Sequence, residues 1–347
     1  MDEPTMTAWT TSAGQHTVEC TTLPRPRPGP AQLLVRVIVC GVCRTDLHVI
    51  DEDIPPHADR VVPGHQIVGE VIATGADVTG YDIGDRVGIA WLRHTCGMCE
   101  YCRSGRENLC PRTRFTGWDE DGGCAQYAVV DAGYAYRLPA DVDPFAIAPL
   151  LCAGIIGYRA LRRANLPPGG LLGIYGFGSS AHIAAQLAMA SGARVAAITR
   201  GEGNRQLARD LGVAFVGDSD DVPPEPLDAA IVFAPVGAIM PQALAATAPG
   251  GTVVSAGIHM SPIPEFSYDE LLFGERDLRS VTANTRADGD QFLRLARQLG
   301  ITPHVTVYPF GRVDTALEDL RAGRAEGSLV IAVADDAGPA DQGDAAK

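Results

Sequence analysis

The sequence lacks three features that would place the protein in a membrane, in a secretory pathway or on a nucleic acid. No apolar run approaches the roughly 18 residues needed to span a bilayer. The N-terminal stretch MDEPTMTAWTTSAGQ is acidic and has no apolar segment of the kind found in signal peptides. A net charge of −14 at pH 7 opposes binding to a polyanion. We therefore expect a cytoplasmic protein with neither a membrane nor a nucleic-acid partner.

The sequence also lacks internal repeats, and its cysteines are unevenly placed. Its 347 residues are more than a single hydrophobic core usually organises, which predicts two domains.

Eight of the nine cysteines lie between Cys20 and Cys124, the ninth is Cys152, and none lies in the last 195 residues. In a reducing compartment, cysteines in this pattern point to metal binding or catalysis before disulfides.

The chain divides into two regions with different patterns of predicted secondary structure. Short β-like runs separated by turn residues predict a mostly β domain before residue 150. From about 153 to 285, short apolar strands alternate with helical stretches, which is typical of a parallel sheet covered on both faces. A helix is expected at 287–299, followed by two β-like segments, and the tail DDAGPADQGDAAK is expected to be disordered. The fold class is therefore α/β with a second, mostly β domain.

The segment CGMCEYCRSGRENLC places four cysteines within fifteen residues, namely Cys96, Cys99, Cys102 and Cys110. Four thiolates on turns at this spacing fit a tetrahedral zinc ion. An iron–sulfur cluster uses similar spacings and is the chemical competitor. Because four thiolates leave no open coordination position, we expect a structural role for this group, which we call the cysteine lobe (residues 96–110).

A second cysteine motif, CGVCRTDLH at 40–48, is open to three interpretations. Cys40 and Cys43 could be a redox pair, half of a zinc site, or one metal ligand beside an unrelated thiol. His65 in the glycine-flanked turn of VVPGHQIVGEV and Cys152 in APLLCAGIIG are further ligand types for a second metal site. Their separation in sequence is too large for spacing alone to join them to Cys43.

A strand, a glycine-rich turn and a helix follow one another in LLGIYGFGSSAHIAAQLA. The turn has the form G-x-G-x-x-A, with Gly176, Gly178 and Ala181. In this context the motif predicts a dinucleotide site, with the pyrophosphate at the helix N-terminus beside Ser179 and Ser180.

No acidic residue lies between Phe177 and Gly201, where an NAD site usually has one on the ribose hydroxyls. Thr199 and Arg200 follow the second strand instead, with Arg205 nearby. A small hydroxyl and arginines suit a 2′-phosphate, so the sequence favours NADP, although NAD stays viable if Arg200 is a solvated strand-end residue.

Together GVCRTDLH, PGHQIVGEV, CGMCEYCRSGRENLC, LLCAG and GFGSSA resemble, in order and spacing, the zinc-dependent medium-chain dehydrogenase/reductase family, in particular its microbial tetrameric alcohol dehydrogenases. The resemblance covers about residues 15 to 333. It implies a GroES-like catalytic domain of residues 1–152 and 286–347 that holds both zinc sites, and a Rossmann domain of residues 153–285. A homo-oligomer, tetramer or dimer, is expected from the same branch.

The resemblance also assigns roles to residues. It implies catalytic zinc ligands Cys43, His65 and Cys152, with an open fourth position. Thr45 and His48 would relay the hydroxyl proton, and Arg44 would contact the cofactor pyrophosphate. Asp46 would orient His65 from the second coordination shell. The family usually has Glu where this chain has Gln66, which puts any step that relies on that carboxylate in doubt.

The implied reaction is hydride transfer between a small primary alcohol or its aldehyde and NAD(P), with two Zn²⁺ per chain. Trp91 and, to a lesser extent, Trp118 would line the alcohol pocket, where a large ring favours small substrates. Polyols and aromatic alcohols stay open as substrates. A zinc-free quinone reductase or a non-enzymatic nucleotide-binding relative would be expected to lack the zinc ligands or relay groups that this chain retains.

Overall fold

The computed structural model describes residues 3–324 and 326–334, so the predicted disorder of residues 335–347 lies outside the described part of the chain. The chain forms two compact units. The first consists of Met1–Cys96, Arg112–Leu151 and Val305–Lys347, and the second of Gly97–Pro111 and Cys152–His304. This division places most of the cysteine lobe and the helix at 286–299 in the second unit, whereas the sequence-based division assigned both to the catalytic domain. The predicted domain boundaries stay a prediction.

The larger sheet of the first unit is built around one long strand, β3 (Gln32–Val42). Its run LLVRVIVCGV is apolar except for Arg36 and is almost wholly buried, as expected for a strand covered on both faces. The spatial order is β10-β6-β5-β3-β18-β17, with β9 also paired to β3, and every pair is antiparallel except β17 with β18. The other strands are β5 (Gln66–Thr74), β6 (Arg86–Ile89), β9 (Tyr127–Asp131), β10 (Ala135–Arg137), β17 (Val305–Pro309) and β18 (Ser328–Ala332).

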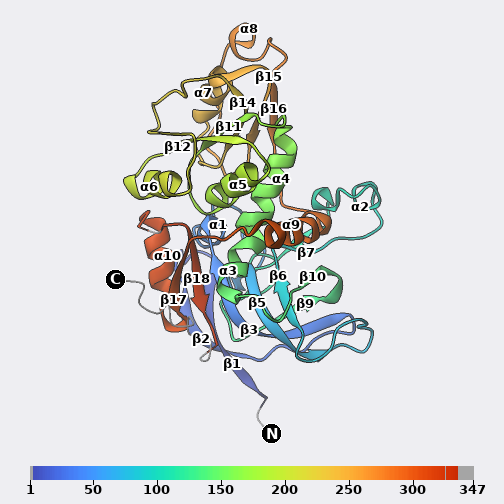
Figure 1. The fold of residues 1–347 in the computed structure, drawn as a ribbon. Coiled ribbons are helices and arrows are strands. Elements are labelled where there is room, and N and C mark those ends of the chain that lie inside the picture. Colours follow the sequence, from blue (N-terminus) through green and yellow to red (C-terminus); the bar gives the residue numbers. More distant parts are fainter. Residues whose placement is uncertain (1–2, 325, 335–347) are drawn as a thin grey trace, which may run out of the picture. The chain divides into compact units, whose positions relative to one another are not determined.

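Two small sheets and three helices complete the first unit (Figure 1). The small sheets contain β1 (Thr5–Ser12), β2 (Glu19–Pro24) and β4 (Arg60–Val61), and β7 (Leu92–His94) with β8 (Arg114–Phe115). The helices are α1 (Arg44–Ile50), α3 (Pro144–Pro149) and α10 (Val313–Arg321). Helix α10 buries Val313, Ala316 and Leu317, an i, i+3, i+4 set that packs into the core of this unit.

The second unit contains a six-stranded parallel sheet in the order β13-β12-β11-β14-β15-β16. Counted along the chain, this is the doubly wound order 3-2-1-4-5-6 of a dinucleotide-binding fold. The strands are β11 (Leu171–Tyr175), β12 (Arg194–Ile198), β13 (Phe215–Gly217), β14 (Leu227–Val232), β15 (Thr247–Ser255) and β16 (Asp277–Ser280). The predicted α/β class and its parallel sheet are confirmed.

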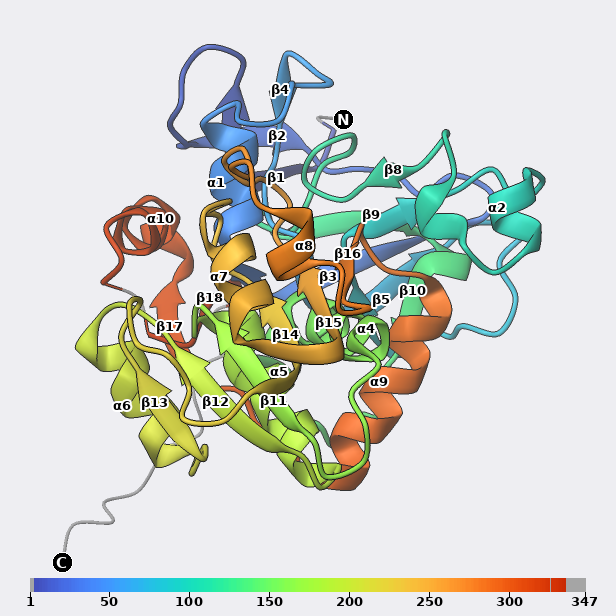
Figure 2. The ribbon, with the colours of Figure 1, turned by 90° about the horizontal axis from the view of Figure 1, so that it is seen from above.

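Helices cover both faces of this sheet with separate apolar clusters. Alanines of α4, α5 and α6 pack on one face, and α7 packs on the other through Met240 and Leu244. The helices of this unit are α2 (Glu100–Arg103), α4 (Ile155–Ala164), α5 (Ser179–Ala190), α6 (Glu202–Asp210), α7 (Ile239–Ala246), α8 (Tyr268–Leu271) and α9 (Arg286–Leu299). Helix α9 lies beside α4 (Figure 2), where Arg159 pairs with the buried Asp288.

A π-helical turn, Leu150–Gly154, joins α3 to α4 into one helical stretch of 21 residues, Pro144–Ala164. By length and mean hydropathy this stretch could cross a membrane, so the expectation that no apolar run approaches that length was wrong. Of its most apolar window, 56% is buried inside the protein, a property that core helices of globular proteins share.

Candidate active site and metal centres

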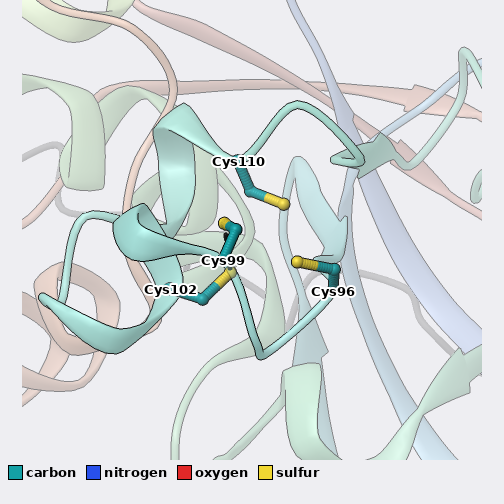
Figure 3. Close-up of side chains that lie close together, drawn as sticks. All are labelled: Cys96, Cys99, Cys102 and Cys110. Carbon is teal, nitrogen blue, oxygen red and sulfur yellow. Dashed lines mark hydrogen bonds between the residues drawn. The ribbon is translucent and has the colours of Figure 1, made fainter.

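Four cysteine sulfurs of the lobe converge on one point (Figure 3). The Sγ atoms of Cys96, Cys99, Cys102 and Cys110 all lie within 4.8 Å of one another, and those of Cys99 and Cys102 are 3.5 Å apart. Ligand atoms on one tetrahedral zinc lie about 3.5–4 Å apart, so a small contraction would complete the shell. The donor set of four thiols therefore fits a closed, structural metal site.

Side chains of the lobe are tied to the segment that begins α9. Glu107 is buried, and its Oε1 accepts hydrogen bonds from the backbone N–H of Arg286 (3.0 Å) and from its guanidinium Nε (3.3 Å). The Asn108 amide donates to the carbonyl of Thr282 at 2.7 Å. These contacts explain why residues 97–110 of the lobe belong to the second unit, although they interrupt the first in sequence.

Helix α1 begins at Cys43 and carries the carboxylate that organises the second metal-ligand group. Cys43 is the N-cap residue, and its backbone N–H donates to Oδ2 of Asp46 at 2.7 Å. The other oxygen, Oδ1, accepts from the backbone N–H of Gly64 (2.9 Å) and lies 3.1 Å from Nδ1 of His65. Asp46 is only 1% exposed, so its charge is satisfied almost wholly by these contacts.

His65 is fully buried with its two ring nitrogens directed to different partners. Nδ1 faces Asp46, and Nε2 lies 3.5 Å from Sγ of Cys43. Burial opposes a charge on the ring, but Asp46 and then Cys43 outweigh it and raise the pKa of His65 well above its usual value. The same negative surroundings that favour a proton here favour a metal cation.

The third member of this group is Cys152. Its sulfur, Sγ of Cys43 and a ring nitrogen of His65 lie within 4.8 Å of one another. Cys152 directly follows Leu151, the residue at which the first unit gives way to the second. Two thiols and one imidazole leave one position of a tetrahedral ion without a protein ligand, which is the donor set of a catalytic zinc site. The residues present therefore fit the metal.

Cys40 and Gln66, which lie close in sequence to the ligands Cys43 and His65, are not part of the metal-ligand group. Cys40 is fully buried in β3, and its thiol lies beside Cys124, whose pKa is raised by the hydrogen bond to Cys40 and by burial. Gln66 is 2% exposed and packs over Gly41 across the β3–β5 ladder. Among the described residues, no group accepts a hydrogen bond from its Nε2.

The predicted relay residues lie on α1. Thr45 and His48 are three positions apart, so they share one face of the helix. Thr45 is half-buried, and Nδ1 of His48 lies 2.7 Å from Oδ2 of Asp53. Arg44 is exposed at the start of the same helix. The sequence interpretation missed Asp53, because nothing local marks an exposed loop carboxylate as a partner of His48.

A row of aromatic rings begins at His65. The Trp91 ring meets His65 edge-on with centroids 5.0 Å apart, and stacks on Phe115 at 4.9 Å and on Trp118 at 5.9 Å. His57 stacks on Trp118 at 4.1 Å, and its Nδ1 lies 2.7 Å from Asp119. The sequence had singled out Trp91 and Trp118; His57 and Phe115 join them only through the fold.

A pocket near the end of this row is lined by residues such as Val49, Glu52, His57 and Trp118. None of the three converging metal ligands is among its lining residues. This pocket therefore does not include the metal-ligand group.

The glycine-rich turn connects β11 to α5 as predicted. Gly176 has φ of +85°, and a Cβ there would lie 2.9 Å from the backbone nitrogen of Ala234, so both conformation and space require glycine. At Gly178 a Cβ would meet no atom within 4 Å, which leaves the backbone open to an incoming group. Ala181 is fully buried, and Ser179 and Ser180 are partly exposed at the helix start. This geometry fits a pyrophosphate.

The three residues expected at the adenosine end make different contacts. The Thr199 hydroxyl is buried and accepts the backbone N–H of Phe177 at 3.1 Å, so it supports the glycine turn itself. Arg200 is exposed. Arg205 binds the carboxylates of Glu202 (2.9 Å) and Asp218 (2.6 Å), so a phosphate would compete with two acids for its guanidinium.

The structure combines a dinucleotide-binding fold with two candidate metal-ligand groups, and comparison with known proteins identifies the class. Residues 29–140 match the family model described as "Alcohol dehydrogenase GroES-like domain", and residues 181–306 match "Zinc-binding dehydrogenase". A probable alcohol dehydrogenase of Mycobacterium tuberculosis (strain CDC 1551 / Oshkosh) is 55% identical over 313 residues, covering 89% of this chain and 90% of the relative.

Two solved structures have similar folds. A cinnamyl alcohol dehydrogenase from Sorghum bicolor superimposes with a TM-score of 0.87 at 29% identity, covering 96% of this chain and 98% of that one. Acetophenone reductase from Geotrichum candidum NBRC 4597, in complex with NAD, gives 0.87 at 28% identity and covers 97% and 100%. The chain belongs to the zinc-dependent medium-chain alcohol dehydrogenase family.

Proposed function

We propose that the protein is a zinc-dependent alcohol dehydrogenase that transfers hydride between a small primary alcohol and NAD(P), and in reverse reduces the aldehyde. The convergence of Cys43, His65 and Cys152 carries this proposal. It combines a catalytic donor set with a buried carboxylate that orients the imidazole, and it occurs in a chain whose 55% identical relative is named a probable alcohol dehydrogenase. A non-enzymatic relative would have no need of this arrangement.

When bound, zinc supplies a Lewis acid that lowers the pKa of the substrate hydroxyl, and the nicotinamide accepts the hydride. Asp46 accepts a hydrogen bond from Nδ1–H of His65, so Nε2 is the ring nitrogen that would bind the metal. Thr45 accepts the hydroxyl proton and passes it to His48, whose Nδ1 faces Asp53 at the surface. Gln66 supplies no carboxylate beside His65.

The proposal includes a second zinc ion held by the four thiolates of the cysteine lobe. Four sulfur ligands leave no position for a substrate, so this ion has a structural role. The ion would fix the conformation of the lobe, and the hydrogen bonds of Glu107 and Asn108 would in turn hold the segment that begins α9.

For the cofactor we propose NADP over NAD. Between Phe177 and Gly201 there is no acid to repel a 2′-phosphate, and the exposed Arg200 follows β12 directly. Arg205 would have to be shared with Glu202 and Asp218, so we assign the larger part of phosphate recognition to Arg200. Replacing Arg200 with Ala should raise KM for NADP about tenfold, as expected for one lost charged contact, and leave KM for NAD within twofold.

A second substrate class, aromatic alcohols, is favoured by the ring row from His65 through Trp91 and Phe115 to Trp118. Flat apolar rings stack on such a surface. The similar Sorghum and Geotrichum proteins are named for aromatic compounds, cinnamyl alcohol and acetophenone. The bulk of Trp91 beside the metal ligand still favours small primary alcohols as the main class.

We further propose a cytoplasmic homo-oligomer, a tetramer or dimer. Strand β16 ends the parallel sheet and exposes Leu278, so a second copy of the chain could extend the sheet there. Size-exclusion chromatography with light scattering tests this, and a monomeric mass at micromolar concentration would contradict it.

The test of function is an assay panel on zinc-loaded protein. Ethanol, butanol, benzyl alcohol and sorbitol are each offered with NAD and with NADP, and reduced nicotinamide is followed at 340 nm in a standard absorbance assay. Cys43→Ser tests the metal site, and Cys20→Ser, a change to an exposed cysteine of the same unit, is the matched control. We expect turnover of the short alcohols, abolished in Cys43→Ser and unchanged in Cys20→Ser.

Each outcome is decisive for one part of the proposal. Turnover of benzyl alcohol above butanol would favour the aromatic class, and a preference for NAD would overturn the cofactor assignment. No turnover in either direction, with both zinc sites loaded, would contradict the alcohol dehydrogenase assignment and make Gln66 the first residue to restore to Glu.

A further inference from the structure

A buried histidine, His182, lies one helical turn after the glycine-rich turn, on helix α5. It is fully buried and uses both ring nitrogens. Nδ1 lies 3.1 Å from the carbonyl oxygen of Gly178, and Nε2 lies 3.0 Å from the backbone nitrogen of His304. The sequence interpretation of the glycine motif assigned it no role.

These partners fix the tautomer of the ring. The backbone N–H of His304 can only donate, so Nε2 of His182 accepts and Nδ1 carries the proton donated to Gly178. Burial lowers the pKa of His182 to about 4, so the ring is neutral at the pH of ordinary assays. The neutral ring of His182 therefore donates to the carbonyl of Gly178 and accepts from the backbone N–H of His304.

The carbonyl that His182 binds belongs to the peptide group that opens α5. The backbone N–H of His182 also donates to this oxygen, at 3.1 Å, so Gly178 O accepts twice from one residue. Because a peptide group is planar and trans, fixing the carbonyl of Gly178 also fixes the direction of the N–H of Ser179. The N–H groups of a helix's first turn are the ones that bind phosphate.

One turn further along α5, Gln186 binds the same segment as the far side of His182. Its Oε1 accepts from the backbone N–H of Thr302 at 3.1 Å, and its Nε2 donates to the Thr302 carbonyl at 2.9 Å. Residues 301–304 follow α9 and end the second unit. Gln186 therefore holds this segment without touching the glycine turn, which makes it a control for His182.

We propose that His182 is a positioning residue for the cofactor pyrophosphate: by holding the Gly178–Ser179 peptide group it keeps the first N–H of α5 aimed at the phosphates. This inference rests on the proposed dinucleotide binding. It predicts that the two hydrogen bonds of the ring differ in consequence. The bond to Gly178 sets cofactor affinity, and the bond to His304 contributes only to stability.

Two substitutions separate these bonds. The Asn side chain places an amide near the position of Nδ1, so His182→Asn keeps a donor for Gly178 and loses the partner of His304. The Gln side chain reaches the position of Nε2, so His182→Gln keeps an acceptor for His304 and loses the contact with Gly178. Dissociation constants for NADH and NADPH are measured by isothermal titration calorimetry on zinc-loaded protein, with melting temperatures and steady-state kinetics alongside.

We expect His182→Gln to weaken dinucleotide binding about fivefold, the effect of one neutral hydrogen bond, with KM for the cofactor rising and kcat at saturation unchanged. His182→Asn and Gln186→Leu should bind within twofold of wild type, although both melt at lower temperature. Equal dissociation constants for the Asn and Gln variants, or affinity that follows melting temperature across all three, would overturn the proposal. If wild-type protein binds neither dinucleotide, the proposed function fails instead.

Discussion

Replacing the buried, neutral histidine His182 should change how the free energy of unfolding depends on pH. His182 has a pKa of about 4 in the folded protein, because burial disfavours the charged ring, against about 6.5 in an unfolded chain. As pH falls below about 6.5, the unfolded chain takes up this proton first, so the free energy of unfolding declines until about pH 4. At pH 5 the loss is about 2 kcal/mol relative to pH 7.5.

Replacing His182 with Asn removes this contribution, so the variant should lose about 2 kcal/mol less than wild type between pH 7.5 and pH 5. The assay is urea unfolding followed by circular dichroism at both pH values, with the difference between them compared across proteins. The matched control is His16→Asn, a change to an exposed histidine at positive φ, a conformation that Asn adopts readily. If wild type and His182→Asn lose the same free energy, the ring is not held buried and neutral, and the reasoning is refuted.

Three further changes test other parts of the structure. Cys110→Ser should remove one zinc equivalent per chain by mass spectrometry and lower the melting temperature, whereas Cys20→Ser should do neither; full zinc content in Cys110→Ser would exclude the lobe as a metal site. Asp288→Asn should cost about 3 kcal/mol in urea unfolding, because it leaves Arg159 without its buried partner, and a loss below about 1 kcal/mol would mean the pair is solvated. Asn165 lies in the left-handed region at φ of +51°. Asn165→Ala should lower the free energy of unfolding by about 1 kcal/mol, and Asn165→Gly should hardly change it. Equal losses in the two variants would show that backbone strain is not the cause.

The sequence by itself determined whatever depends on close neighbours. Four cysteines within fifteen residues can reach one ion through short turns, so the lobe was predicted with its ligands, and the sulfurs do converge. The glycine turn was predicted for the same reason, since a strand, two glycines and a helix make a phosphate site within twenty residues. The alternation of strands and helices fixed the parallel sheet.

Only the tertiary structure decided which distant residues meet. Cys43, His65 and Cys152 are spread over more than a hundred residues, and the sequence joined them only through a family resemblance; in the fold a helix N-terminus, a strand start and a π-helical turn bring them together. His57 and Phe115 became part of the ring row, and Asp53 a partner of His48, with no local signal. His182 and His304 are 122 positions apart, and neither hydrophobic periodicity nor motif spacing predicts a contact between residues so distant in sequence. Sequence spacing predicts contacts within one turn or strand, whereas contacts between residues far apart in sequence depend on how whole helices and strands pack together.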